Sequence, residues 1–183
     1  MRSAAIKGTL WAVAIGGFRG ADVSDPKRLV LKVAEAVRPQ TAQLVDARMV
    51  ASFEHLRMAA VNAANAIGGG FSVSKSIAIE TLLRASTVDQ ISKAIEAIGV
   101  TPRTGGVAIV IFATSVPDAE EAYRRAAVIL GEEDDSVLEI DDEKYHRLKE
   151  WFGIGEAELD AAGGRGALTG LIVERGALLS LRR

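Results

Sequence analysis

The 183-residue sequence contains no cysteine, which excludes thiol catalysis, redox-active cysteine pairs and zinc sites built on cysteine. It also lacks long hydrophobic runs. The most apolar run covers residues 107–113, far short of the roughly 20 residues that span a bilayer. Its only histidines, His55 and His146, have no second histidine at metal-ligand spacing. We therefore expect a cytoplasmic protein with no membrane span, no metal and no cofactor.

Excess charge of one sign is also missing, since the net charge is −2. The total conceals an uneven distribution along the chain. Residues 1–105 hold 13 Lys and Arg against 8 Asp and Glu, and residues 106–160 hold 5 against 15. The composition excludes a protein that binds nucleic acid over its whole surface, but it permits binding at one basic face.

Apolar periodicity and capping residues predict several helices and strands. We expect strands at 10–15, 42–50, 107–113 and 136–140. Helices are expected at 26–38, 53–67, 76–83, 88–98, 116–130 and 141–152, with a further helix around Leu159. The segment 168–181 is ambiguous between helix and strand. The run at 107–113 needs cover on both faces, so we predict one α+β domain over residues 1–183, with helices on both faces of a mixed, largely antiparallel sheet.

The glycine-rich loop at 68–76 suggests binding of a phosphate group. Lys75 and Ser76 copy the end of a nucleotide-binding P-loop, but Ser74 stands where that motif needs glycine, which argues against nucleotide hydrolysis. A lysine at a helix start can still hold an isolated phosphate or a nucleic-acid backbone. An alternative is a small-molecule enzyme whose cleft brings together Lys75, Glu80 and His55. The acidic segment at 132–143 lacks the ligand pattern of a calcium loop and is expected to be a solvated turn.

Several short blocks occur together in the order found in one known family. They are Ser52 to Leu56, Ser74 to Ser76, Ile79 to Leu83, Gln90 to Ile95 and, near the C-terminus, Val173 to Leu181. Their order and spacing over nearly the whole chain resemble the kinase-binding subunit of the KEOPS complex, the TPRKB family, in its archaeal form. No single block is specific, so the resemblance depends on the combination.

The resemblance implies a non-catalytic subunit that binds and supports the small atypical kinase/ATPase of KEOPS, and through it the other subunits. That complex makes threonylcarbamoyladenosine in transfer RNA, and archaeal relatives also capture the tRNA 3′ CCA end. For tRNA contact, the residues predicted from the resemblance are Lys75, Ser76, Ile77, Arg84 and Lys93. For the kinase interface, the apolar C-terminal tail predicts Leu171, Ile172, Leu178, Leu179 and Leu181.

The sequence departs from the family pattern in two regions. Between the two short helices the family usually carries an aromatic, a glycine and a basic residue, whereas this sequence has Arg84, Ser86-Thr87 and Asp89. Asp89 stands where the family tends to be basic, so kinase docking is the firmer expectation of the two. Gly176 replaces a bulkier residue in the C-terminal block, which predicts a looser tail.

Overall fold

The two central strands of the sheet come from the apolar segments recognised in the sequence. The computed structural model describes residues 1–181 and pairs β2 (Ala12–Arg19) antiparallel with β4 (Gly106–Ala113) over their full length. Outside them lie β3 (Thr41–Asp46), next to β4, and β1 (Arg2–Ala5), next to β2. The two-residue β5 (Glu132–Glu133) also pairs with β2. Every pairing in residues 1–181 is antiparallel, and the order β1-β2-β4-β3 makes β3 an edge strand.

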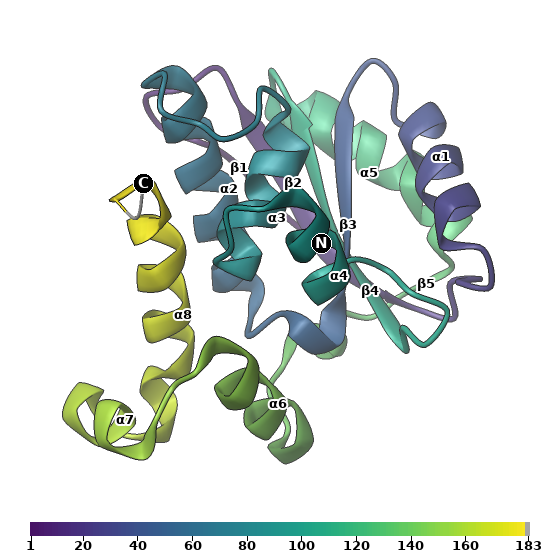
Figure 1. Cartoon of the computed structure of the whole chain (residues 1–183). Coiled ribbons are helices and arrows are strands. Elements are labelled where there is room, and N and C mark those ends of the chain that lie inside the picture. Colours follow the sequence, from purple (N-terminus) through teal and green to yellow (C-terminus); the bar gives the residue numbers. More distant parts are fainter. Residues whose placement is uncertain (182–183) are drawn as a thin grey trace.

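Helices cover both faces of this sheet (Figure 1). One face packs against α2 (Phe53–Gly68), α3 (Ile77–Ser86) and α4 (Ile91–Ile98), and the other against α1 (Pro26–Ala36) and α5 (Val116–Leu130). Side chains of β4 alternate between the two cores: Val110 and Phe112 join the first, Ile109 and Ile111 the second. This arrangement explains why the whole of β4 is apolar, and the predicted α+β class with covered faces is confirmed.

A third set of helices forms an arm beside the sheet and its covering helices. It consists of α6 (Asp142–Phe152), α7 (Glu156–Ala162) and α8 (Leu168–Ala177), followed by the 3-10 turn η4 (Leu178–Leu181). In Figure 1 the arm ends with α8, drawn in yellow, beside α2. Its core includes Phe152 and Ile172 together with Ala51 from the segment before α2. The ambiguous segment 168–181 is therefore helical.

Most predicted helix starts are confirmed by capping hydrogen bonds. The side chains of Asp25, Ser52, Ser76, Ser115 and Asp141 each accept a hydrogen bond from a backbone N–H in the first helical turn. Thr87 is an exception. The stretch from Thr87 to Gln90 matches a capping box and predicts that Thr87 caps the next helix, but Thr87 ends α3 in a left-handed conformation (φ 59°) and does not cap α4. The N-cap of α4 is Gln90, whose side chain makes no capping bond.

The strand expected at 136–140 is wrong. Residues Asp135–Leu138 form the 3-10 turn η2, in which the Ser136 N–H donates a hydrogen bond to the Asp134 carboxylate. The Lys144 ammonium then donates hydrogen bonds to the carbonyls of Val137 (2.9 Å) and Glu139 (3.1 Å). These side-chain bonds replace the ladder that a strand would need. The short edge strands β1 and β5 were not expected from the sequence.

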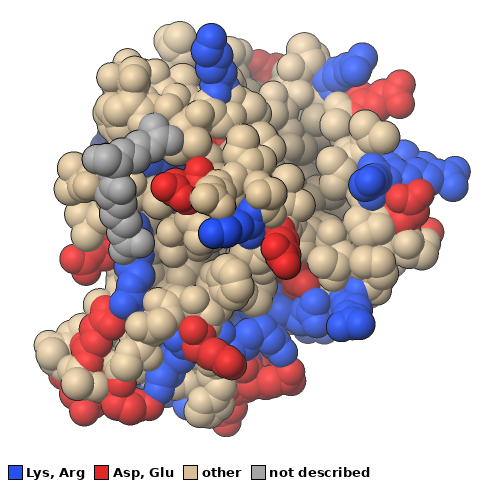
Figure 2. All heavy atoms as spheres, viewed as in Figure 1, with Lys and Arg blue, Asp and Glu red and all other residues tan. Residues whose placement is uncertain are grey.

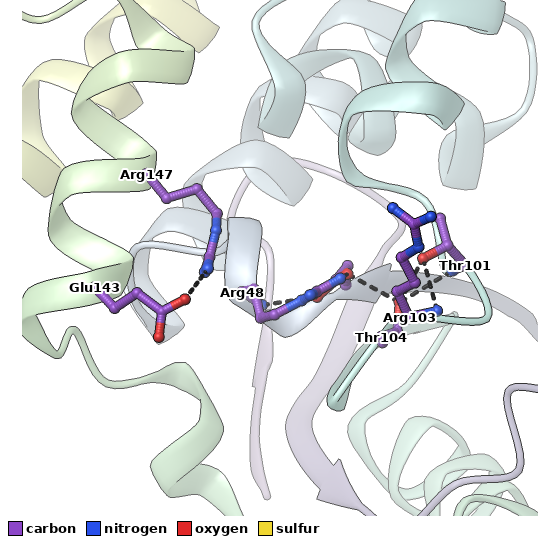
Figure 3. A network of polar contacts seen from close by, with 7 residues as sticks. Arg48, Thr101, Arg103, Thr104, Glu143 and Arg147 are labelled. Carbon is purple, nitrogen blue, oxygen red and sulfur yellow. Dashed lines mark hydrogen bonds and ion pairs between the residues drawn. The ribbon is translucent and has the colours of Figure 1, made fainter.

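A polar network closes one end of β3 (Figure 3). Asp46 is 3% exposed and accepts hydrogen bonds from Arg48 and from the Thr104 hydroxyl (2.9 Å). The Thr104 hydroxyl in turn accepts a hydrogen bond from the Thr101 N–H (3.0 Å). The loop 101–104 is thereby fixed over the C-terminal end of the edge strand. Within residues 1–181, no helix is long and apolar enough to cross a bilayer.

Candidate functional site

The glycine-rich loop between α2 and α3 is held in place by a buried carboxylate. Glu80, on the inner face of α3, is fully buried and accepts hydrogen bonds from the backbone N–H groups of Val73 and Ser74, each at 2.9 Å. Lys75 and Ser76 follow directly and lie exposed at the start of α3. The exposed basic end of the loop is therefore positioned from inside the protein.

The same carboxylate forms a buried ion pair with Arg84 one turn along α3. Arg84 is 2% exposed, and its Nε and Nη2 donate to Glu80 Oε1 at 3.0 and 2.8 Å. Its Nη1 lies 3.5 Å from the carbonyl oxygen of Gly176 in α8. Buried charges are tolerated only when they are paired and hydrogen-bonded, as both are here. The pair thus connects the loop, α3 and α8.

This geometry corrects two of the predicted tRNA contacts. Arg84 and Ile77 are both buried, so they cannot contact a phosphate or a base in this conformation. Lys75, Ser76 and Lys93 are exposed as expected. Arg84 is buried because the Glu80 carboxylate needs a counter-charge inside the protein. An i, i+4 Glu–Arg spacing in an otherwise apolar helix was the sequence signal for this pair.

Phe71 was missed in the sequence analysis. It follows the run Gly68 to Gly70, in which α2 ends, and is 49% exposed at the beginning of the loop that carries Lys75. Exposed aromatic rings, together with basic residues, bind unstacked bases of single-stranded nucleic acids. Its position directly after Gly68 to Gly70 was the available signal.

His55 has a structural role. It is 2% exposed, its Nδ1 accepts a hydrogen bond from the Ala51 N–H at 3.1 Å, and its Nε2 lies 3.0 Å from the Ala85 carbonyl oxygen. The first bond fixes the tautomer, so Nε2–H is the donor in the second. Burial lowers the pKa of His55 to about 4, so the ring is neutral at pH 7. It joins the start of α2 to the end of α3.

The alternative of an enzymatic cleft around Lys75, Glu80 and His55 is not supported. Lys75 is exposed, whereas Glu80 and His55 are buried. The polar atoms of His55 bond to backbone groups, and those of Glu80 bond to backbone groups and to Arg84. A catalytic set needs groups that converge on a shared open space. These three side chains do not do so.

The C-terminal aliphatic residues separate into buried and exposed members. Ile172 and Leu179 are 0% and 3% exposed and pack into the protein's own core, so they are not available to a partner. Leu171 is half-buried. Leu178 and Leu181 are 40% and 77% exposed. The predicted interface is thus reduced to three side chains at the end of α8 and in η4.

Gly176 does not loosen the tail. A Cβ atom added at this position would lie 2.5 Å from the carbonyl oxygen of Arg84. The absence of a side chain lets α8 approach α3 closely enough for their backbones to touch. The expectation of a looser tail is therefore wrong, because the glycine permits tighter packing.

Several carboxylates of the acidic segment 132–143 bind other parts of the same chain. Asp135 accepts a hydrogen bond from the Gly17 N–H at 2.9 Å, and Asp134 pairs with Arg19 of β2. The N-terminal ammonium of Met1 binds Glu133 and Asp135. Within residues 1–181, no three His, Asp or Glu side chains are grouped as they would be to hold a metal ion. In Figure 2, charged side chains of both signs gather over the arm of α6 and α7.

Comparison with known proteins gives two findings. A family model described as kinase binding protein CGI-121 matches residues 21–179. The regulatory protein Cgi121 of Methanocaldococcus jannaschii is 32% identical over 142 residues, which cover 77% of this chain and 84% of that protein. The range matched by the family model includes the anchored loop, the buried ion pair and all of α8.

Proposed function

Because the chain belongs to the CGI-121 family of kinase-binding proteins, we propose that it is a non-catalytic regulatory subunit of a small atypical kinase/ATPase. The partner we propose is the KEOPS kinase, whose complex makes threonylcarbamoyladenosine in transfer RNA. The family match, together with exposed aliphatic side chains at the end of α8, supports this function. His55 and Glu80 form hydrogen bonds that hold the protein together, which favours the non-catalytic role over an enzymatic one.

The kinase-binding surface consists of Leu178 and Leu181, with Leu171 at its border. Exposed aliphatic side chains on an ordered segment favour a protein partner, because contact removes their surface from water. The segment is ordered by its buried neighbours, Ile172 and Leu179, which attach it to the domain. A partner therefore meets a preformed surface and does not have to order a flexible tail.

Replacement of Leu178 by Asp tests this surface. We expect Leu178→Asp to abolish co-elution with the kinase recovered from a native cell extract, because a charge would be buried in an apolar contact. Circular dichroism should be unchanged, since Leu178 is 40% exposed. Val128→Asp is the matched control, because Val128 is 87% exposed on α5, and it should co-elute normally. Retained co-elution of Leu178→Asp would contradict the proposed interface.

We further propose that the anchored loop contacts the single-stranded 3′ CCA end of tRNA. Lys75 and Lys93 supply positive charge, Ser76 offers a hydroxyl at the start of α3, and Phe71 supplies an exposed ring. Single-stranded RNA is bound by this combination of phosphate contacts and base stacking. Asp89, also exposed, places a negative charge between α3 and α4 and is expected to limit the affinity.

Salt titration of tRNA binding tests this surface. Lys75→Glu should weaken binding and reduce the slope of log K against log salt concentration by about one, because one phosphate contact is lost. Lys32→Glu, an exposed lysine on α1, is the matched control and should retain the wild-type slope. Phe71→Ala should weaken binding with little change in slope. Equal binding of tRNA with and without its CCA end would contradict the proposal.

A further inference from the structure

The outer edge of β3 carries backbone groups that have no backbone partner within residues 1–181. The carbonyl of Leu44 accepts a hydrogen bond from the Gln43 side-chain amide at 2.7 Å, so it points away from β4. Because backbone groups alternate along an antiparallel strand, the N–H and C=O of Ala42 point to the same outer edge. Outside the β3–β4 ladder, no backbone hydrogen bond within residues 1–181 reaches residues 41–45. The loop pinned to Asp46 covers only the far end of the strand (Figure 3).

An apolar groove of about 510 Å³ lies beside this edge, where Leu44 itself is 4% exposed. Its floor includes Gln43 and Leu44 of the strand. One wall comes from α1 and the other from α3, α4 and the residues that follow, through Val30, Leu31, Ile79, Leu82, Ile95 and Val100. Three of these aliphatic side chains are unusually open to water: Val30 is 45%, Leu31 69% and Ile95 51% exposed. In Figure 2 the corresponding surface is mostly uncharged.

We propose that this edge binds an extended segment of another polypeptide, which adds a strand to the sheet. A peptide backbone is the ligand that offers donors and acceptors at the spacing of Ala42 and Leu44. Aliphatic walls stand on both sides of the edge, so side chains on both faces of the added strand would meet apolar surface. The segment should therefore carry consecutive aliphatic residues, like a strand buried on both faces.

Lys27, which lines the groove, indicates the charge expected at one end of the bound segment. It is the charged residue among those that line the groove, and it forms no ion pair within residues 1–181. An acidic residue beside the aliphatic run would complement it. The expected partner segment thus combines an acidic end with four or five aliphatic residues.

A second copy of this chain fits the groove poorly. Val45 packs in the core on the α2–α4 side, so Thr41 and Gln43 share that face by alternation. In a pair formed by two β3 edges, these polar side chains would enter the groove beside Ile95. A different polypeptide is therefore the better occupant. In Figure 1, α1 and α8 lie on opposite sides of the molecule, so the β3 groove is separate from the proposed kinase surface.

Hydrogen exchange with a defined peptide tests the proposal. The probe is the acetylated, amidated peptide Glu-Glu-Val-Ile-Val-Leu-Val-Ser, added to the ¹⁵N-labelled full chain. At saturation, the amides of Ala42 and Leu44 should exchange about tenfold more slowly, because each gains a backbone partner. The Gln43 amide already bonds to β4 and should change little. The matched control peptide carries N-methyl groups on alternate residues and should bind at least about tenfold more weakly.

Variants of the groove complete the test. Leu31→Asp and Ile95→Asp should each weaken peptide binding about tenfold, whereas Val128→Asp on α5 should bind as the wild type does. All three positions are exposed, so folding should be retained. Failure of the peptide to bind, or equal binding of the N-methylated peptide, overturns the proposal. Protection of Ala42 that rises with protein concentration in the absence of peptide also overturns it, because the occupant would then be a second copy.

Discussion

Helix α3 buries charged side chains, whereas the C-terminal segment of α8 and η4 exposes aliphatic ones. In α3, Glu80 and Arg84 are buried at 0% and 2% exposure. In η4, Leu178 and Leu181 are exposed at 40% and 77%. In globular proteins the usual arrangement is the reverse. The comparison teaches that residue type alone does not identify a binding surface. Here the buried charges organise the protein, and the exposed aliphatic side chains are available to a partner.

The two regions are also in direct contact. Arg84 approaches the carbonyl of Gly176, and Gly176 has no side chain that would separate the helices. The pair that fixes the loop before α3 therefore also supports α8, the helix that leads into Leu178 of η4. Substitutions that disturb the packing of one region should therefore also destabilise the other. Substitutions of exposed residues in η4 should leave the stability of the core unchanged.

The largest expected effect comes from removal of the buried carboxylate. Glu80→Ala leaves Arg84 charged, buried and unpaired, which should lower the free energy of unfolding by about 3–5 kcal/mol. Chemical denaturation measures this loss. Glu121→Ala breaks an exposed Glu–Arg pair on α5 and should cost less than about 1 kcal/mol.

The double variant Glu80→Leu with Arg84→Met refines the interpretation. It removes both charges at similar volume, so most of the lost stability should return. The N–H groups of Val73 and Ser74 would still lack their acceptor, and their hydrogen exchange should be fast. A double variant that stays as unstable as Glu80→Ala would contradict the pairing argument.

The pH dependence of stability tests the buried histidine. Because the pKa of His55 is lowered from 6.5 to about 4, the unfolded chain binds more protons than the folded chain between these pH values. Stability should therefore fall as the pH decreases through this window and level off, for this group, below about pH 4. The contribution is about 3 kcal/mol.

Denaturation at a series of pH values measures this contribution as the difference between wild type and His55→Gln. The variant should show a correspondingly flatter pH dependence. His146→Gln, which removes an exposed histidine, is the matched control for the substitution itself. A His55→Gln curve parallel to the wild type would contradict the neutral, buried state.

A smaller effect is expected at the contact between α3 and α8. Gly176→Ala places a methyl group 2.5 Å from the Arg84 carbonyl oxygen, and we expect a loss of about 1–3 kcal/mol of unfolding free energy. Gly170→Ala lies in the same helix with nothing within 4 Å of the new atom. It should stabilise the protein by about 0.5–1 kcal/mol. Equal effects of the two substitutions in thermal denaturation would contradict the close helix approach.

The smallest effect is expected at Leu181, an exposed side chain of η4. Leu181→Ser should change the free energy of unfolding by less than about 0.5 kcal/mol, because the side chain is 77% exposed. Leu179→Ala, two residues earlier, removes a buried side chain and should cost about 2–5 kcal/mol. If Leu181→Ser were comparably destabilising in chemical denaturation, its side chain would belong to the core and not to a partner surface.

Much of the fold was predictable because it depends on local signals. The apolar run of β4 and the capping residues Asp25, Ser52 and Ser115 identified a covered sheet and the starts of its helices. The 3-10 turn η2 was not predictable, because it depends on Lys144, which reaches it from the following helix. The strand order also depends on contacts that join distant parts of the chain.

The candidate sites were predictable only in part. The sequence identified the loop with Lys75 and the aliphatic C-terminus, and both contain exposed residues. It did not reveal which members are buried. Arg84 has the charge of a phosphate-binding residue, and only its pairing with Glu80 in three dimensions removes it from the surface. Leu179 and Leu181 are chemically identical, and only the direction of the η4 turn distinguishes them.

The pairing of β2 with β4 has a consequence for the order of folding. It joins Ala12 to Ala113 and Arg19 to Gly106, so the centre of the sheet closes only after α1 to α4 have been synthesised. Contacts of such long sequence separation form slowly. Helix α8 packs on α2 and α3, which themselves need the sheet as a base. We therefore expect the segment with Leu178 to reach its final position last, so that a partner recognising it selects chains whose folding is complete.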